Sequence, residues 1–408
     1  MKIIEVNKFY YRRGGAESYL LDIEKKLQSE GHQVAIFSMK HPKNSPSVWE
    51  KYFVSRLSFN EGSLLDKIRY PFRLFYSFEA KRKFEKLVKD FQPDVIHIHN
   101  IYHQISPSIL PVAKKYGIPV YMHLHDYKLI CPNYQLFNKG EICYDCAAPN
   151  YFRCIPKRCV NNSLPRSIGA TLEMWFHHSI LKIYEKNVDC YIAPSKCMKD
   201  ICVRFGVPEK KIVVLYNFIF TSENFVSIKE TNIKSYLGYI GRLSDEKGID
   251  ILLQALALVD ENIILKIAGE GPARVTLEKL RDDLGLNKRV EFMGKLSGSS
   301  LDDFSSQMTT MIIPSIWLEN MPFSVLEALS KGKIVIASNI GGLPELITDQ
   351  KNGFLFEPGN PQDLAKIISG LPQIDIEKVS QEAKNSVASF NIDQHYQSLL
   401  KIFCLYVK

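Results

Sequence analysis

In the first half of the chain, hydrophobic residues occur in two patterns that alternate along the sequence. Short apolar runs such as "KIIEV", "QVAIFSM", "DVIHIHN" and "PVYMHLHDY" alternate with longer stretches, such as "SYLLDIEKKLQSEG", whose apolar residues recur every three or four positions. Nearly continuous apolar strands separated by helices are typical of parallel sheets covered by helices on both faces. The pattern predicts an α/β, Rossmann-like doubly wound domain over residues 1–216, with an irregular, cysteine-containing insertion near residues 128–166.

The same alternation restarts in the second half, after the polar stretch "TSENFVSIKETNIK". We interpret residues 217–232 as a linker and residues 233–385 as a second Rossmann-like domain. Residues 386–408 are expected to form a C-terminal helix, and its return to the first domain is an open alternative. Two doubly wound parallel-sheet domains in series predict a cleft lined by loops at the carboxyl ends of the strands, where open α/β sheets bind ligands.

The composition is that of an ordinary soluble globular protein, with 46% hydrophobic and 24% charged residues in a chain of 408. No apolar run has the length of a membrane-spanning helix, and the N-terminal sequence "MKIIEVNKFYYRRGG" lacks the long apolar core of a secretory signal. We therefore expect a cytoplasmic protein.

Charge divides the chain into a basic and an acidic half. Residues 1–216 hold 33 Lys and Arg against 20 Asp and Glu, whereas residues 217–408 hold 19 against 24. A basic half predicts an anionic partner, such as nucleic acid, an anionic membrane surface or a phosphate-bearing acceptor, unless it is simply a solvated face. We expect no nucleic-acid partner, because the chain shows no base-reading or base-stacking module.

The segment "DKIRYPFRLFYSFEAKRKFEKL", residues 66–87, mixes basic and aromatic residues. Such a mixture suits contact with an anionic lipid surface, which would place the protein peripherally on the inner face of the membrane. Ordinary core packing of the aromatic residues is the alternative, and Pro71 argues against one long amphipathic helix.

The stretch "PSIWLENMPFSVLEALSKG" places Glu319 before a predicted helix start and Glu327 within the helix. Pro322 suits the first helical position, and the free amides near Phe323 to Val325 would form an anion site. Phosphates on those amides would leave one carboxylate on each side for hydroxyl groups. A nucleoside diphosphate-sugar has this layout of sugar hydroxyls, diphosphate and ribose hydroxyls.

Two cations follow another strand, in "GYIGRLSDEKG". Arg242 and Lys247 lie five residues apart, and charge-assisted bonds from both would stabilise a leaving diphosphate. The stretches "AGEGP" and "GGLP" add glycine-containing loops at strand ends, where the backbone can approach a ligand closely.

In this order and spacing, "GRLSDEKG", "AGEGP", "PSIWLENMPFSVLEAL" and "ASNIGGLPELI" resemble the C-terminal domain of family-4 retaining glycosyltransferases, which have the GT-B fold. The first half is similar through "YYRRGGAESYL", "PDVIHIHN", "HLHDY" and "VLYNF", so the resemblance covers nearly the whole chain. It implies that Glu319 contacts the donor sugar and that Glu327 binds the ribose hydroxyls. Arg242 and Lys247 match the diphosphate-binding pair.

The resemblance also implies roles for backbone segments of the second domain. The backbone of Met321, Pro322 and Phe323 is expected near the sugar and phosphates, and the segment at Lys295 and Leu296 near the base. Asn320 departs from the family pattern, which often has glycine there, but asparagine also tolerates a left-handed conformation.

For the first domain, the resemblance places a histidine against the donor sugar, and His125 of "MHLHDYKLICPN" is a better match than His123. A structural role is the alternative for a histidine at a strand end. The loop from Gly14 and Gly15 to Glu17 is expected near the diphosphate and acceptor, with His99 as a weaker candidate near the acceptor.

No catalytic metal or cofactor is expected, because cations and the helix end take the place of a divalent ion in GT-B enzymes. The resemblance implies retention of anomeric configuration by front-face displacement, with the leaving phosphate helping to take the acceptor proton. Five of the nine cysteines lie close together, and "CYDC" has a spacing typical of zinc thiolates. Structural zinc, reduced thiols and a disulfide all remain open for Cys131, Cys143, Cys146, Cys154 and Cys159.

We therefore expect a glycosyltransferase that moves a hexose from a nucleoside diphosphate-sugar to a growing glycan or a lipid-linked acceptor, in surface polysaccharide biosynthesis. A GT-B-like nucleotide-sugar epimerase and a non-catalytic nucleotide- or glycan-binding module are the alternatives. The sequence does not define the base, the sugar, the acceptor or the linkage.

Overall fold

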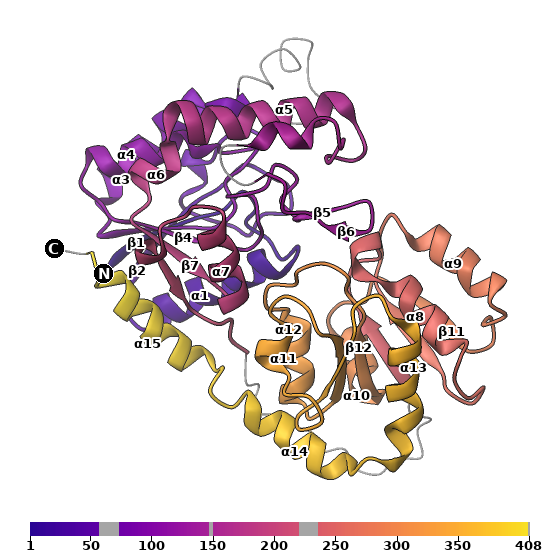
Figure 1. Ribbon diagram of the computed structural model, residues 1–408. Coiled ribbons are helices and arrows are strands. Elements are labelled where there is room, and N and C mark those ends of the chain that lie inside the picture. Colours follow the sequence, from indigo (N-terminus) through magenta and orange to yellow (C-terminus); the bar gives the residue numbers. More distant parts are fainter. Residues whose placement is uncertain (57–72, 147–149, 220–235, 407–408) are drawn as a thin grey trace. The chain divides into compact units, whose positions relative to one another are not determined.

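The protein is represented by a computed structural model that describes residues 1–56, 73–146, 150–219 and 236–406 (Figure 1). The chain forms two compact units. The N-terminal unit comprises residues 1–136, 143–217 and 392–408, and the C-terminal unit comprises residues 137–142 and 218–391. Residues 220–232 of the expected linker lie outside the described residues.

A parallel sheet forms the centre of the N-terminal unit. Within the described residues it has six strands in the order β2-β1-β3-β4-β7-β8. The strands are β1 (Lys2–Val6), β2 (Gln33–Phe37), β3 (Val95–Ile98), β4 (Val120–His123), β7 (Cys190–Ala193) and β8 (Ile212–Val214). The order reverses between β1 and β3, which makes that point the topological switch of this sheet.

Helices connect and cover these strands. They are α1 (Gly15–Ser29), α3 (Phe78–Phe91), α4 (Leu110–Lys115), α5 (Leu164–Trp175), α6 (Ile183–Asn187) and α7 (Lys196–Arg204), and a π-helical turn (Phe176–Leu181) extends α5. The C-terminal helix α15 (Ile392–Phe403) belongs to this unit and packs on α1. Tyr19 of α1 and His395 of α15 bond to each other at 2.7 Å, and the hydroxyl of Tyr121 donates to the carbonyl of Phe403.

The C-terminal unit has its own parallel sheet, with the order β11-β10-β9-β12-β13-β14 in the described residues. Its strands are β9 (Tyr236–Ile240), β10 (Leu265–Ala268), β11 (Val290–Gly294), β12 (Met308–Ile313), β13 (Ile334–Ser338) and β14 (Phe354–Phe356). Its helices are α8 (Ile249–Leu256), α9 (Arg274–Asp283), α10 (Ser299–Gln307), α11 (Phe323–Ser330), α12 (Leu343–Leu346), α13 (Pro361–Gly370) and α14 (Ile376–Ser386). A short antiparallel hairpin, β5 (Phe137–Asn138) with β6 (Glu141–Ile142), clusters with this unit.

Both units are doubly wound parallel sheets, as the alternation of apolar runs and amphipathic stretches predicts. The inner strands are buried because they carry apolar residues on both faces; β13, for example, is buried at all five positions of "IVIAS", whereas the edge strands β8 and β11 are each buried at one position. No helix in the described part of the chain combines the length and the apolar character needed to cross a bilayer.

Candidate active site

The loops that carry the predicted donor residues follow the two central strands of the C-terminal sheet. β9 and β12 are neighbours, β10 and β11 lie beyond β9, and β13 and β14 lie beyond β12. The chain therefore leaves β9 and β12 toward opposite sides, and the carboxyl ends of such a pair are where open α/β sheets bind ligands. Arg242 and Lys247 follow β9, and Glu319 follows β12.

The structure brings Lys247 and Glu319 together, although 72 positions separate them. Glu319 is buried, and one of its carboxylate oxygens accepts hydrogen bonds from Lys247 Nζ and from Ser315 Oγ, both at 2.6 Å. Burial alone would raise the pKa of Glu319, but the charge of Lys247 and the bonds from Lys247 and Ser315 lower it below its usual value. Glu319 is therefore a fixed anion at neutral pH, with a cation beside it.

Glycines hold the neighbouring loops in close contact. Gly248, at φ +63°, lies so close to the carbonyl of Pro314 that a Cβ atom would collide with it, and the amide of Ile316 donates to the carbonyl of Glu246 at 3.0 Å. Gly341 likewise lies against the backbone of Glu319. Gly248 and Gly341 thus let one loop approach the next, which fixes the backbone that carries Glu319. Gly341 belongs to "GGLP", whose expected close approach to a ligand stays a prediction.

The start of α11 differs by one position from the prediction. Pro322 is the N-cap residue, with extended backbone, and Phe323 is the first helical residue. The amide of Val325 already donates to the carbonyl of Pro322 at 3.1 Å, so the expected anion site is reduced to the amides of Phe323 and Ser324. The helix still begins close to Glu319 in sequence, as predicted. Pro322 has an extended backbone, and helical residues begin directly after it.

The other predicted donor residues lie on the loops after β9 and β12, on α11, or just after β11. Arg242 and Glu327 are exposed, Met321 is buried, and Leu296 is half-buried just beyond β11. Asn320 does not adopt a positive φ, so its replacement of the usual glycine imposes no strain. Their roles toward a donor stay predictions.

In the N-terminal unit, the glycine loop leads from β1 into α1. Gly14 is the N-cap residue in an extended conformation, and Gly15 begins the helix. A Cβ atom on Gly14 would make only an ordinary contact with Glu17, so neither strain nor crowding requires glycine at that position.

Four histidines gather at the carboxyl ends of β3 and β4, beside β1. His99 Nδ1 lies 2.8 Å from His125 Nε2, and His99 Nε2 lies 2.9 Å from a carboxylate oxygen of Glu5. The other Glu5 oxygen lies 3.0 Å from His97 Nδ1. An ionised carboxylate only accepts hydrogen bonds, so Glu5 fixes the proton of His99 on Nε2, and Nδ1 then accepts a bond from His125. Glu5 thereby fixes the tautomer and the orientation of the predicted catalytic histidine.

The titration of this cluster follows from its burial. Burial opposes the ionisation of Glu5, but the charge of His97 and the bonds from His97 and His99 hold the pKa of Glu5 at about 2. Burial lowers the pKa of His99 to about 4, and it places the pKa of His123 well below its usual value. His99 and His123 are therefore neutral imidazoles at physiological pH.

Sequence reasoning missed Glu5 and His97. Residues two apart on a strand share a face, so His97 and His99 point the same way, and Glu5 pairs with His97 in the register of β1 with β3. The sequence did show one carboxylate, Glu5, inside the apolar run "KIIEV". Its partner, His97, can be identified only once the strand order is known.

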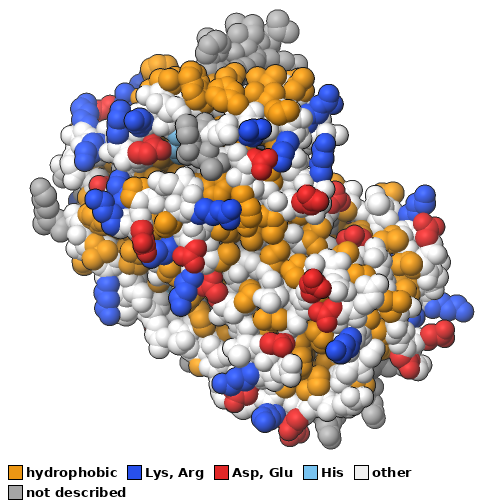
Figure 2. All heavy atoms as spheres, viewed as in Figure 1, with side chains coloured by type: hydrophobic (Ala, Val, Ile, Leu, Met, Phe, Trp, Pro, Cys, Tyr) orange, Lys and Arg blue, Asp and Glu red, His pale blue; other side chains and the backbone are white. Residues whose placement is uncertain are grey.

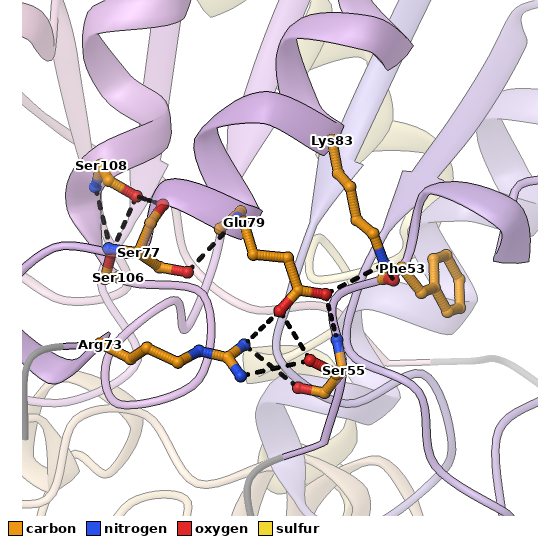
Figure 3. Close-up of polar contacts among 9 residues, drawn as sticks. Phe53, Ser55, Arg73, Ser77, Glu79, Lys83, Ser106 and Ser108 are labelled. Carbon is orange, nitrogen blue, oxygen red and sulfur yellow. Dashed lines mark hydrogen bonds and ion pairs between the residues drawn. The ribbon is translucent and has the colours of Figure 1, made fainter. Parts of the chain in front are cut away.

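The basic segment at residues 66–87 is only partly described, because residues 66–72 lie outside the described residues. Glu79 of α3 forms ion pairs with Arg73 at 2.8 Å and Lys83 at 3.0 Å, and it also accepts bonds from Ser55 (Figure 3). Phe84 and Leu87 are buried. Over the described part, some apolar residues therefore pack in the core, Phe78 is 76% exposed, and two of the cations are held by the half-buried carboxylate of Glu79.

The nine cysteines are free thiols. Cys146 and Cys154 pack with Tyr151 and Met174 in a small apolar core, with Cys159 against it. Among the described residues, the His, Cys, Asp and Glu side chains close enough to share a metal ion form one group, which is His97, His99 and His123 and contains no cysteine. A disulfide is absent from these described thiols, and packing in the small apolar core explains the burial of Cys146 and Cys154.

Comparison with protein families identifies the class of protein. The family described as Glycosyltransferase Family 4 matches residues 13–223, more than half of the chain, and Glycosyl transferases group 1 matches residues 221–385. The chain belongs to glycosyltransferase family 4. The family inferred from the motifs is thereby confirmed, and the protein is a glycosyltransferase.

One curated relative spans the whole of this glycosyltransferase, and another matches part of it. It is 29% identical over 417 aligned positions to an uncharacterized 42.6 kDa protein in the cps region of Klebsiella pneumoniae, covering 99% of this chain and all of that one. It is 28% identical to the poly(ribitol-phosphate) alpha-N-acetylglucosaminyltransferase of Staphylococcus aureus, over 45% of this chain and 39% of that enzyme.

Solved structures agree on the fold of this glycosyltransferase. A glycosyltransferase from Rickettsia africae superposes with a TM-score of 0.69 at 19% identity, covering 100% of this chain and 98% of that one. HepE from Anabaena, solved in complex with UDP and glucose, has a TM-score of 0.66 at 20% identity and covers 99% of each chain. The expected GT-B class, with two Rossmann-like units, is confirmed.

Proposed function

We propose that this glycosyltransferase moves a hexose, with retention of configuration, from a nucleoside diphosphate-sugar to a growing glycan or a lipid-linked acceptor in surface polysaccharide biosynthesis. Support for the donor class comes from HepE, which was solved with UDP and glucose. Support for the pathway comes from the relative in a cps region and from the poly(ribitol-phosphate) enzyme.

The single observation that carries the proposal is the Lys247–Glu319 pair at the switch point of the C-terminal sheet. A buried carboxylate held by a lysine and a serine is rigid, and it lies on the loop that leads into α11. We assign Arg242 and Lys247, with the amides at the start of α11, to the diphosphate, Glu319 to the sugar and Glu327 to the ribose. Positive groups at the diphosphate stabilise the charge that develops as it leaves.

The reaction then needs no protein nucleophile. The bond between the anomeric carbon and the phosphate oxygen breaks, and a bond from the acceptor oxygen to the same carbon forms on the same face. The acceptor proton passes to the leaving phosphate, so charge and atoms balance. We propose that His125 contacts the transferred sugar; in the metal-free chain it is oriented through His99 and Glu5. Because Arg242 and Lys247 supply the positive charge, we propose that the transfer step needs no dissociable divalent ion.

The proposal is tested by incubating the purified protein with a panel of uridine, guanosine, adenosine and thymidine diphosphate-sugars. We expect one donor to raise the melting temperature and to release its nucleoside diphosphate slowly, with water as acceptor. Formation of an epimeric nucleotide-sugar without release would favour the epimerase, and stabilisation without any turnover, also with added polyprenyl-diphosphate-linked sugars, would favour a binding module.

We also propose that the N-terminal unit lies peripherally on an anionic membrane, through a surface that includes α5; the lipid contact expected of residues 66–87 stays a prediction. An apolar stripe runs along α5, and its members are between 37% and 46% exposed: Phe152, Leu164, Ile168, Leu172 and Trp175. Hydrophobic side chains gather over α5 in Figure 2. Residues 150–186 carry six Lys and Arg but only two Glu, one of them buried, so the stripe has a basic surrounding that suits anionic lipid.

Vesicle flotation tests this surface. Ile168→Glu and Leu172→Glu should each weaken binding to phosphatidylglycerol-containing vesicles by roughly tenfold, because each removes a buried aliphatic contact. Val275→Glu on α9, where the valine is exposed in the C-terminal unit, is the matched control. Equal binding by all variants would exclude the stripe, and concentration-dependent dimers lost in Ile168→Glu would show that it pairs two copies instead.

A further inference from the structure

The histidine cluster of the N-terminal unit has more nitrogen atoms than its hydrogen bonds use. We propose that His97, His99 and His123 form a binding site for a divalent transition-metal ion, with Zn²⁺ as the expected occupant. The site lies within the N-terminal unit, and the proposal does not rest on the proposed function.

The three side chains converge because of the strand order. β3 and β4 are adjacent and parallel, and His97 lies opposite Tyr121 in their register, so the ends of both strands meet at one edge of the sheet. One ring nitrogen from each of the three histidines lies within 4.8 Å of the other two. Zinc–nitrogen bonds of about 2.0–2.1 Å place tetrahedral ligands about 3.4 Å apart, so small ring rotations close the set.

Glu5 orients two of the three rings in the manner of a metal site. Its two oxygens take the Nδ1 proton of His97 and the Nε2 proton of His99, at 3.0 and 2.9 Å. The opposite nitrogen of His99, Nδ1, therefore carries a lone pair, and Nε2 of His97 carries one in the neutral form of that ring. Histidine ligands almost always donate their other N–H to a carboxylate or carbonyl, which fixes the tautomer that binds the metal.

Unpartnered nitrogens give an independent indication of a ligand. Nε2 of His97 and both ring nitrogens of His123 are buried without a hydrogen-bond partner in the described structure, and both side chains are at most 1% exposed. A buried polar atom without a partner is rare and destabilising, so a missing ligand is a better explanation than simple packing. His123 is stacked on His125 at 4.7 Å between ring centroids, which aligns it with the other rings.

The chemistry of the set selects the ion. Three imidazoles favour zinc, cobalt, nickel or copper over magnesium or calcium, which prefer oxygen ligands. A dication here also supplies positive charge near the buried, ionised Glu5. The bond from His125 to Nδ1 of His99 must open for the ion to enter, so metal binding changes the surroundings of His125.

The test is the metal content of the full chain, purified from cells grown with added zinc, together with variants that keep the packing. His123→Phe retains an aromatic ring against Tyr19 and His125 but removes the ligand. Glu5→Gln keeps the size but loses one acceptor. We expect about one zinc per folded wild-type chain, and at least tenfold weaker retention against a chelator in both variants. His41→Phe, outside the cluster, should match the wild type.

The cysteines are the competing ligands, and cobalt separates them. The cobalt-loaded wild type should show the visible bands of nitrogen ligation without an intense thiolate charge-transfer band, and Cys143→Ser with Cys146→Ser should leave the bands unchanged. If His123→Phe does not fold, Glu5→Gln alone decides the matter. Zinc content near zero in the folded wild type, unchanged content in Glu5→Gln, or a thiolate spectrum would overturn the proposal.

Discussion

Glu319 and Glu327 are close in sequence but lie in different surroundings. Glu319 is buried and paired with Lys247, whereas Glu327 is exposed on α11. A carboxylate that is fixed before the donor binds can favour the geometry of the transition state, while an exposed one binds ground state and transition state alike. This difference supports the separate roles that we propose for the two side chains.

We predict that Glu319→Ala lowers kcat and leaves the affinity for free nucleoside diphosphate nearly intact, because losing an interaction specific to the transition state reduces turnover. Glu327→Ala should mainly weaken affinity for the donor and for the free nucleotide. Calorimetry with nucleoside diphosphate and steady-state kinetics measure both effects. Loss of nucleotide affinity in the Glu319 variant, with affinity kept in the Glu327 variant, would reverse the assignment.

The lowered pKa of Glu319 also predicts a pH dependence of stability. A carboxyl group whose folded pKa lies below its unfolded value of 4.5 stabilises the fold above pH 4.5, and this contribution is lost as the pH falls through the folded pKa. Glu319→Gln should therefore cost about 1.5–3 kcal/mol of unfolding free energy at pH 7. Denaturant titrations should show that cost shrinking below pH 4.5. If the loss of unfolding free energy in Glu319→Gln did not change with pH, the charge of Glu319 would not be the source of the stabilisation.

At the residue scale, sequence reasoning identified the groups that local motifs carry and missed those that need a partner. Lys247 and Glu319 were both predicted as donor residues, but their ion pair depends on the adjacency of β9 and β12. Glu5 and His97 were not predicted, since an isolated glutamate in an apolar run does not reveal the histidine opposite it. The mixture of basic and aromatic residues in residues 66–87 indicated a lipid surface, which stays a prediction, but it did not reveal the ion pairs of Glu79 with Arg73 and Lys83.

At the element scale, the loops after β9 and β12 are fixed by close backbone contact at Gly248. Alternating periods predicted the strands and helices of both sheets, because burial on two faces leaves a strong pattern. The same pattern could not place the start of α11, where Pro322 is the N-cap residue instead of the first helical residue. It also could not show that Gly248 lies against Pro314, which depends on packing between loops.

Gly248→Ala should destabilise the C-terminal unit by more than about 1 kcal/mol, because alanine is strained at positive φ and its Cβ atom would collide with the carbonyl of Pro314. Gly285→Ala is the matched control, since Gly285 has φ +68° with no atom within 4 Å of the added Cβ. The difference between their midpoints in urea isolates the contact. Equal midpoints would show that the two loops can separate without cost.

At the scale of the whole molecule, two doubly wound units share the chain, and the last helix, α15, belongs to the N-terminal unit. The amino-acid composition showed that the two halves differ in charge, but it did not identify the anionic partner. The basic residues 150–186 surround an apolar stripe on α5 whose exposure only the fold reveals. The sequence therefore indicated a basic half but not which of its surfaces is available.

We predict that sugar transfer continues at its full initial rate in excess EDTA, because fixed cations neutralise the diphosphate. Initial rates with and without EDTA measure this, and zinc held in the buried histidine cluster would leave only slowly. Immediate loss of activity that Mg²⁺ or Mn²⁺ restores would contradict the proposed metal-independent step.

The central claim is that Arg242 and Lys247 stabilise the leaving diphosphate, and turnover at saturating donor tests it most directly. Arg242→Ala and Lys247→Ala should each lower kcat by roughly 10²–10³, the loss expected for one preorganised charge. Lys266→Ala, which removes a cation paired with Glu291 on the same sheet, should keep the wild-type rate. Arg242 is exposed, so its variant should remain folded. Wild-type turnover in both the Arg242 and the Lys247 variants would contradict the account.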